Sequence, residues 1–407
     1  MNDETSNTGS QSFLENLPSS EGDPIFALTE RFKNDNNPNK VNLGIGVYQD
    51  NEGRTSFLKV VQKVQKIIVE EGSAAGYLPL DGNPDFNSGV LRLVFGAGSS
   101  LVEEGRIFAA QTPGGTGGLR VAADFLKSQA GISVIYVSKP TWVNHVKVFS
   151  AAGLETKYYS YLASDGYSLD IEAAYKALKE IKPGSAVLFH ACCHNPTGVD
   201  LNEKQWRELL EICSSQKLIP FFDFAYQGFA TGLDEDARPL RLFAEEGVDY
   251  IAAYSCSKNF SMYGERLGAL IVASKRSEWA KAALGCIKAV IRANYSNPPT
   301  YASRVVSRII KEPDLFKEWA DELKGMRERI KNMRSLLVKG LSERGVKMPY
   351  ILNQNGMFSY TGLNPEQVKT LEEQFGVYIV AGGRMCVAAL NTNNLDYVCE
   401  SIAKVAK

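Results

Sequence analysis

The stretch YIAAYSCSKNFSMYGERLGALIVAS, residues 250–274, holds two apolar runs separated by a polar segment. The runs at 250–255 and 268–274 lack the polar–apolar alternation of half-exposed strands, which indicates strands buried on both faces. Between them stand one lysine, Lys258, and one arginine, Arg266, among hydroxyls, aromatics and glycines. Such a segment after a buried strand is a candidate for the ligand-binding edge of an α/β sheet.

Three more apolar runs of the same character lie upstream. They read SVIYVS (133–138), SAVLFH (185–190) and LIPFFD (218–223). Between them, apolar residues recur at helical spacing, for example over residues 171–181 and 206–213. Strands that alternate with helices predict an α/β fold whose sheet is mostly parallel and carries helices on both faces.

The pattern changes after Pro313, where an apolar stripe with a period near 3.5 predicts a long helix. Strands are expected in MFSYTGL (357–363) and GRMCVAAL (383–390), and a closing helix over residues 394–407. These elements predict a second, smaller α/β domain. The expected divisions are a disordered tail at 1–12, an N-terminal segment joining the small domain at 13–54, a large domain at 55–312, and the linking helix with the small domain at 313–407.

Composition narrows the class of partner. The 407 residues are 44% apolar, and 45 basic against 46 acidic residues leave a net charge of −1. This balance gives no sign of a nucleic-acid or membrane partner, and a small molecule is the expected ligand. Seven cysteines without a CxxC pair argue against a disulfide framework and against a metal site. With no recognisable signal or transit peptide and no apolar run of membrane-spanning length, the protein is expected in the cytoplasm.

Polar residues stand where three of the expected strands end: His190, Asp223 and Ser255. Because parallel strands present their carboxyl ends at one edge of a sheet, these residues are expected to converge on a cleft. The alternative for each one alone is an ordinary loop residue. Asp223 closes an apolar run, where an unpaired carboxylate is costly, so it needs a cationic partner. That partner is either a structural arginine or the protonated ring nitrogen of a pyridine cofactor.

A glycine-rich stretch, QTPGGTGGLRVAADFL (111–126), runs into a helical pattern. Its backbone N–H groups and the helix N-terminus suit a phosphate, although a tight turn explains the glycines equally well. Lys258, taken alone, reads as a surface charge. Beside an anion-binding loop and a strand-end carboxylate, its amine becomes a candidate for a Schiff base with an aldehyde. Pyridoxal 5′-phosphate is the cofactor that explains all of these features together.

These residues carry a family resemblance. HNPTGVD (194–200), SCSKNFSMYGERLG (255–268) and RANYSNPP (292–299) together resemble the class I aminotransferases of fold type I, in particular the aspartate and aromatic amino-acid aminotransferase group. The resemblance extends over nearly the whole chain. It implies the fold type I architecture, with the large domain binding pyridoxal phosphate and the small domain built from both chain ends.

The resemblance also implies roles for individual residues. Lys258 resembles the lysine that forms the Schiff base and moves the proton, Asp223 the partner of the ring nitrogen, and Tyr226 the tyrosine at the phenolic oxygen. His145 and His190 resemble residues behind the cofactor ring, and His194 is expected to be structural. The expected catalytic residues are Lys258, Asp223 and Tyr226, and the other expected cofactor-binding residues are Gly115, Thr116, Trp142, Asn195, Ser255, Arg266 and Tyr77.

Substrate recognition is expected from two arginines. Arg384 resembles the arginine that binds the α-carboxylate, and Arg292 resembles the one that binds a second carboxylate. In the family, Arg292 and Tyr77 act across the interface of a homodimer whose active sites are shared between subunits. The substrate-binding residues are expected to be Gly46, Trp142, Asn195, Arg292 and Arg384.

The expected reaction is ping-pong transamination of L-aspartate with 2-oxoglutarate, which gives oxaloacetate and L-glutamate. The chain departs from the commonest family pattern at Gly76, Ser261 and Gly264. These departures leave open whether aromatic amino acids are also substrates, or even the main ones. A pyridoxal phosphate lyase on the same fold is one alternative, but it would not need Arg292. A non-catalytic interaction protein that only retains the fold is another, but it would not need the intact set of site residues.

Overall fold

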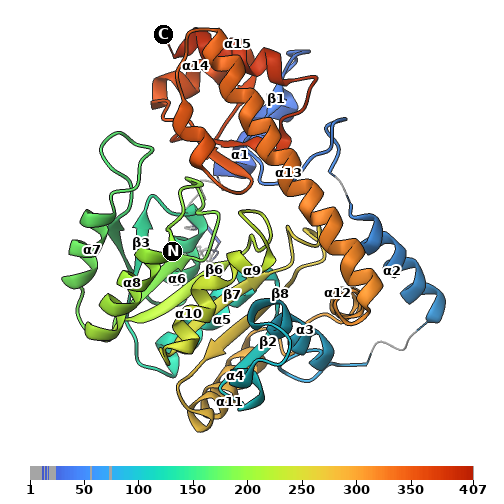
Figure 1. The fold of residues 1–407 in the computed structure, drawn as a ribbon, viewed down its shortest axis with the longest axis vertical. Helices are drawn as coiled ribbons and strands as arrows, with labels where there is room; N and C mark the ends of the chain where they lie inside the picture. The colour runs from blue at the N-terminus through green and yellow to red at the C-terminus, as the bar shows by residue number, and fades with distance from the viewer. Residues whose placement is uncertain are drawn as a thin grey trace, which may run out of the picture.

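The computed structural model describes residues 12, 14–15, 17, 24–55, 57–72 and 76–406. Figure 1 shows a large sheet surrounded by helices, a smaller helical body above it, and one long helix that connects them. The expected tail at residues 1–12 lies outside the described residues, apart from residue 12. In the part of the chain that the structure describes, no helix is both long and apolar enough to cross a membrane.

The large sheet has seven strands in the order β2-β8-β7-β6-β5-β3-β4. β8 runs antiparallel to both of its neighbours, and the other pairs are parallel. The strands are β2 (Ile107–Pro113), β3 (Val134–Lys139), β4 (Glu155–Ser160), β5 (Ala186–His190), β6 (Ile219–Phe224), β7 (Tyr250–Ser255) and β8 (Leu267–Ala273). The five strands predicted upstream of residue 275 are confirmed to within one residue, whereas β2 and β4 were missed.

Helices cover both faces of this sheet, as the sequence predicts. Two adjacent residues of β6 show the division, because Phe221 belongs to one apolar core and Phe222 to the other. The first core includes side chains of α5, α6 and α11, and the second includes those of α7, α8 and α10. The helices of this part are α3 (Pro84–Phe95), α4 (Ser100–Glu103), α5 (Gly114–Ser128), α6 (Val143–Ala151), α7 (Ile171–Lys179), α8 (Glu203–Ser215), α9 (Leu233–Asp236), α10 (Arg238–Glu245), α11 (Ser277–Asn294) and α12 (Tyr301–Lys311).

Both ends of the chain build the smaller body. Its short parallel pair joins β1 near the N-terminus to β10 near the C-terminus, and the long helix α13 descends from it towards α12 and α2 (Figure 1). Only the first part of the expected strand 383–390 is a strand, since a 3₁₀ turn follows at η2. The elements are α1 (Pro24–Asn34), β1 (Val41–Asn42), α2 (Lys59–Glu71), α13 (Pro313–Glu343), η1 (Pro349–Asn353), β9 (Phe358–Tyr360), α14 (Pro365–Phe375), β10 (Val377–Tyr378), β11 (Arg384–Cys386), η2 (Val387–Ala389) and α15 (Leu395–Val405).

The sheet register brings the predicted strand ends together. His190 at the end of β5 lies opposite Asp223 in β6, and Ser255 at the end of β7 lies opposite Gly268 in β8. Because β8 is antiparallel, it starts at the edge where its neighbours end, which places Arg266 next to the β2–α5 turn. This edge of the sheet therefore collects residues from four separate segments of the chain.

Candidate active site

A cavity of about 260 Å³ lies at this edge of the sheet and reaches the smaller body. Eleven of the thirteen residues that the sequence analysis assigned to the site line it. They are Gly46, Gly115, Thr116, Trp142, Asn195, Asp223, Tyr226, Ser255, Lys258, Arg266 and Arg384.

Lys258 lies in the turn after β7, with its Nζ 5.0 Å from the centre of the Tyr226 ring. Burial lowers the pKa of Lys258 to about 8, and the positive charges of Arg266 and Arg384 act in the same direction. The carboxylate of Asp223 opposes this shift. A lysine with such a pKa has far more neutral amine near neutral pH than an ordinary lysine, and a nucleophile or a base requires the neutral form.

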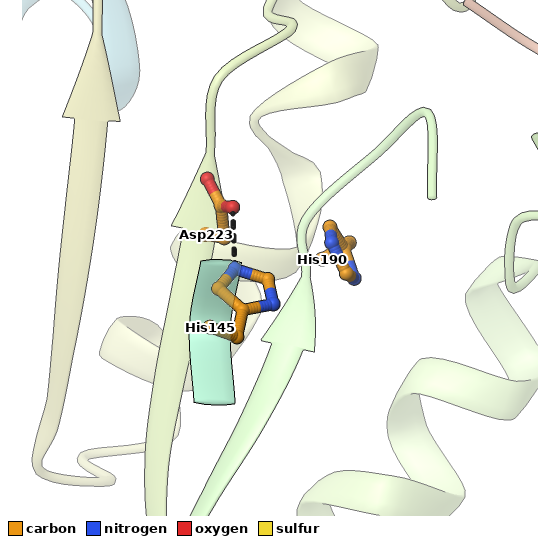
Figure 2. Close-up of side chains that lie close together, drawn as sticks. All are labelled: His145, His190 and Asp223. Atoms are coloured by element: carbon orange, nitrogen blue, oxygen red, sulfur yellow. Dashed lines mark hydrogen bonds and ion pairs between the residues drawn. The ribbon is translucent and has the colours of Figure 1, made fainter. Parts of the chain in front are cut away.

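Asp223 receives a hydrogen bond from behind the cavity. Figure 2 shows His145 pointing at the Asp223 carboxylate, and its Nε2 lies 3.0 Å from Oδ2. The other ring nitrogen, Nδ1, lies 2.8 Å from the Thr141 hydroxyl oxygen. Burial alone would raise the pKa of Asp223, but the His145 hydrogen bond and the positive charge of Lys258 help to hold it below its usual value. Asp223 is therefore a buried carboxylate that stays ionised.

The other two histidines pack beside this pair. His190 is 7% exposed and its Nε2 has no hydrogen-bond partner among the described residues. Burial lowers its pKa to about 3, so it is neutral. The ligand atoms of His145, His190 and Asp223 lie within 4.8 Å of one another, but both nitrogens of His145 already have partners. His194 is 2.8 Å from the Thr197 hydroxyl and stacks on Tyr161, which supports its expected structural role.

The β2–α5 turn forms a narrow cradle at one end of the cavity. Gly114 has φ +72°, and a Cβ there would lie 2.6 Å from Nη2 of Arg266. A Cβ on Gly115 would lie 3.0 Å from that of Ser255. The N-terminus of a fifteen-residue helix, an arginine and a hydroxyl thus surround one small space. This combination suits a phosphate group.

Arg384 lies at the opposite end, on β11. It is 4% exposed, donates from Nη2 to the Gly44 carbonyl at 2.6 Å, and approaches the Asn195 side-chain oxygen at 3.3 Å from Nη1. The ring of Phe358 covers one face of its guanidinium at 4.3 Å. The cavity is therefore lined by two arginines from different parts of the fold, Arg266 and Arg384, together with Lys258 and Asp223.

Two expected site residues do not line the cavity. Tyr77 is 95% exposed, and Arg292 is exposed with Nη1 hydrogen-bonded to the Ser296 hydroxyl at 2.5 Å. Both were expected to act on a second subunit, so their roles stay predictions. Conversely, five residues that line the cavity were not predicted: the apolar Leu119 and Ala225, and also Ser257, Tyr263 and Phe358. Leu119 lies in the quoted glycine-rich stretch, and Ala225 lies between the predicted residues Asp223 and Tyr226. Ser257 and Tyr263 lie within the quoted motif around Lys258, but Phe358 carried no recognisable signal.

Comparisons with known proteins agree with this geometry. Residues 38–402 match the family model described as aminotransferase class I and II. The chain is 46% identical to an aspartate aminotransferase of Escherichia coli over 394 residues, which are 96% of this chain and 100% of that protein. It is 43% identical to an aromatic-amino-acid aminotransferase of the same organism, over 94% of this chain and 98% of that protein. A solved aromatic-amino-acid aminotransferase of Burkholderia pseudomallei, covalently bound to pyridoxal phosphate, superposes with a TM-score of 0.95 at 43% identity, covering 97% of this chain and 100% of that one.

Proposed function

This chain belongs to the class I and II aminotransferases, and on that premise we propose that it transfers the amino group of L-aspartate to 2-oxoglutarate with pyridoxal phosphate as cofactor. The products are oxaloacetate and L-glutamate, formed in two half-reactions of a ping-pong mechanism. The observation that carries this proposal is that a lysine with a lowered pKa, an ionised aspartate and two arginines, Arg266 and Arg384, line one cavity.

The residues present fit pyridoxal phosphate from end to end. The cradle that a Cβ on Gly114 or Gly115 would fill suits the phosphate, with Arg266, Ser255 and the start of α5 as donors. Asp223, held ionised by His145, suits a protonated ring nitrogen. Trp142 lines the same cavity and offers a flat ring for stacking. When bound, the cofactor supplies an aldehyde that reacts with amines and a ring that withdraws electrons from the carbon bearing the amino group.

The chain's own residues then handle protons and charge. With the cofactor bound, the neutral Nζ of Lys258 would accept the proton from Cα of the substrate and deliver it to the aldehyde-derived carbon of the cofactor, so it would serve as the general base and acid. The ionised Asp223 carboxylate would hold a proton on the ring nitrogen of the bound cofactor. The Tyr226 hydroxyl and the Asn195 amide line the cavity and would donate hydrogen bonds to the bound cofactor, and both groups are buried and therefore act in a medium of low dielectric.

The site binds its substrates through their carboxylate groups. The planar guanidinium of Arg384 matches the α-carboxylate that every amino-acid and 2-oxo-acid substrate carries. Gly46, which lines the cavity between the two bodies, presents backbone beside it. Each charge-assisted hydrogen bond contributes about 1.5–3 kcal/mol to the binding free energy. If a second cation is present, this is enough for dicarboxylic substrates to be preferred over neutral ones.

That second cation comes from another copy of the chain. We infer a homodimer in which Arg292 binds the distal carboxylate and Tyr77 binds the phosphate of the partner's site. Both side chains are exposed in the single chain and stand outside its own cavity.

We also propose the division of the chain into segments 13–54, 55–312 and 313–407, which is supported by the pairing of β1 with β10. A cytoplasmic location is supported by the seven cysteines, none of which forms a disulfide.

An aromatic amino acid is the second candidate donor, because aromatic-amino-acid aminotransferases are almost as similar to this chain as aspartate aminotransferases are. The test is to load the purified protein with pyridoxal phosphate and to compare kcat/KM for aspartate and phenylalanine with 2-oxoglutarate as acceptor. We expect aspartate to be preferred. A preference for phenylalanine would make the aromatic activity the main one, and no transfer from either would contradict the proposed function.

A further inference from the structure

We propose that Arg334 is a positioning residue for the carboxylate site: it holds the segment 356–359 so that the ring of Phe358 keeps the Arg384 guanidinium in the orientation that binds a carboxylate. The inference rests on the proposed function, since it assigns the α-carboxylate of the substrate to Arg384. Arg334 itself lines no part of the cavity.

Arg334 is a buried cation on α13 that binds neutral oxygens. It is 3% exposed, and its Nη2 donates to the carbonyls of Gly356 at 2.7 Å and Phe358 at 3.2 Å. Its Nε donates to the Ser359 hydroxyl at 3.2 Å. No carboxylate of the described residues forms an ion pair with it, and burial lowers its pKa to about 10, so it remains charged at neutral pH. Burying the charge of Arg334 is costly, and its hydrogen bonds fix the main chain of segment 356–359.

That stretch leads directly to the cavity. Phe358 begins β9, which pairs antiparallel with β11, so that Phe358 lies opposite Cys386 and Tyr360 opposite Arg384. The Phe358 ring lies 4.3 Å from the guanidinium of Arg384, a favourable cation–π geometry. The ring is also wedged against Gly46, where a Cβ would come within 2.8 Å of its Cζ atom. Arg334 therefore fixes the strand and the ring against which Arg384 rests.

Asn355, the residue directly before this segment, contacts the loop that carries Asn195. The Asn355 N–H donates to the Gly198 carbonyl at 2.6 Å, and its side-chain amide donates to Asp200 at 3.1 Å. The Asp200 carboxylate in turn accepts the backbone N–H groups of Cys193 and His194, each at 2.8 Å. Segment 355–359 thus lies between Arg334 and both residues of the pair Asn195–Arg384.

This arrangement predicts a selective effect. Two parallel hydrogen bonds form only when the guanidinium lies in the same plane as the bound carboxylate. A guanidinium tilted out of that plane weakens both hydrogen bonds. Arg334 touches neither the cradle around Gly115 nor the Lys258–Asp223 pair, so cofactor binding and amine chemistry should not depend on it. A purely structural role would instead reduce stability and every activity together.

The experiment uses the protein loaded with pyridoxal phosphate and two carbonyl-reactive probes. Aminooxyacetate carries a carboxylate, and methoxyamine lacks one. Arg334→Lys keeps the charge but loses the forked geometry. It is expected to lower the second-order rate constant for aminooxyacetate, and kcat/KM for aspartate, by about tenfold, mainly through KM, while the methoxyamine rate stays within about twofold.

Two further variants keep the test decisive. Arg344→Met removes an arginine directly after the last residue of the same helix that also binds a carbonyl, that of Gly340, and should leave both probe rates unchanged. Phe358→Leu should reproduce the selective loss, and the double variant Arg334→Lys/Phe358→Leu should lose little more than the stronger single one, because both act along one path. This comparison applies even if Arg334→Lys is less stable than the parent.

An equal loss with both probes, or no loss with aminooxyacetate, would overturn the positioning role. Failure of the proposed function has a different signature. In that case the unaltered protein would not transfer nitrogen from aspartate to 2-oxoglutarate at all, whatever the behaviour of Arg334→Lys.

Discussion

His145 Nε2 lies 3.0 Å from Asp223 Oδ2, and both residues are buried. The contact connects α6 to the end of β6, and its two residues are 78 positions apart in the sequence. With the Thr141 hydroxyl donating to Nδ1, the Nε2–H group donates to the carboxylate and favours its ionised form. The negative charge of Asp223 is thus built into the fold and available to a cation in the cavity.

Asp223→Asn keeps the shape of this side chain but removes its charge. We expect turnover with aspartate and 2-oxoglutarate to fall by roughly 100-fold or more, since a fixed charge at the reacting group is lost. Steady-state kinetics at saturating cofactor measures the loss. Asp124→Asn on α5, whose carboxylate pairs with Arg120 at the surface, is the matched control and should be fully active. Normal turnover in Asp223→Asn would refute the role of its charge.

Lys258 should destabilise the protein when no cofactor is present. Its pKa falls from 10.5 to about 8 on folding, so the unfolded chain binds this proton more tightly. The cost, at most about 3 kcal/mol, is complete below pH 8 and disappears as the pH rises towards 10.5. Lys258→Met should therefore be more stable than the parent at pH 7 by about 1–3 kcal/mol, and the gain should shrink at pH 10. Urea unfolding of the cofactor-free proteins checks this, and a variant less stable at pH 7 would contradict it.

Arg292→Leu should change substrate preference. In the dimer that we propose, it removes the cation for the distal carboxylate, which aspartate has and phenylalanine lacks. The expected loss in kcat/KM is about 10- to 100-fold for aspartate and much less for phenylalanine, consistent with one or two charge-assisted hydrogen bonds. Competing-substrate kinetics gives the ratio directly. Equal losses for both amino acids would remove Arg292 from substrate recognition.

Tyr77→Phe tests the shared site. If this exposed hydroxyl donates to the phosphate bound in a second subunit, its loss should weaken pyridoxal phosphate binding by roughly five- to tenfold. Fluorescence titration of the cofactor-free protein measures the dissociation constant. Tyr158→Phe, at another exposed tyrosine, is the control and should bind normally. An unchanged constant for Tyr77→Phe would leave the phosphate to residues of one chain.

Local sequence patterns predicted much of the large sheet. The unbroken apolar runs located β3, β5, β6, β7 and β8, because strands buried on both faces need no polar alternation. They could not show that β8 is antiparallel, since its short connection to β7 leaves the direction open. β4 was missed because ETKYYS is exposed and polar along one edge, and β2 because its alanines resemble the following helix.

The site was predicted in part from strand ends and in part from the family resemblance. His190, Asp223 and Ser255 follow from the rule that ligands bind at the carboxyl ends of parallel strands. Which distant residues meet there does not follow, because the hydrogen bond from His145 to Asp223 and the packing of Phe358 on Arg384 depend on tertiary structure. Arg334 has the appearance of an ordinary surface arginine in the sequence, and only its burial reveals its partners.

The central claim is that Lys258 and Asp223, together with pyridoxal phosphate, move an amino group from aspartate to 2-oxoglutarate. The most direct test supplies ¹⁵N-aspartate and unlabelled 2-oxoglutarate to the purified, cofactor-loaded protein and follows the label by mass spectrometry. We predict ¹⁵N-glutamate with the parent protein and none above background with Lys258→Ala. Label released as ammonia, or glutamate labelled equally well by Lys258→Ala, would contradict the account.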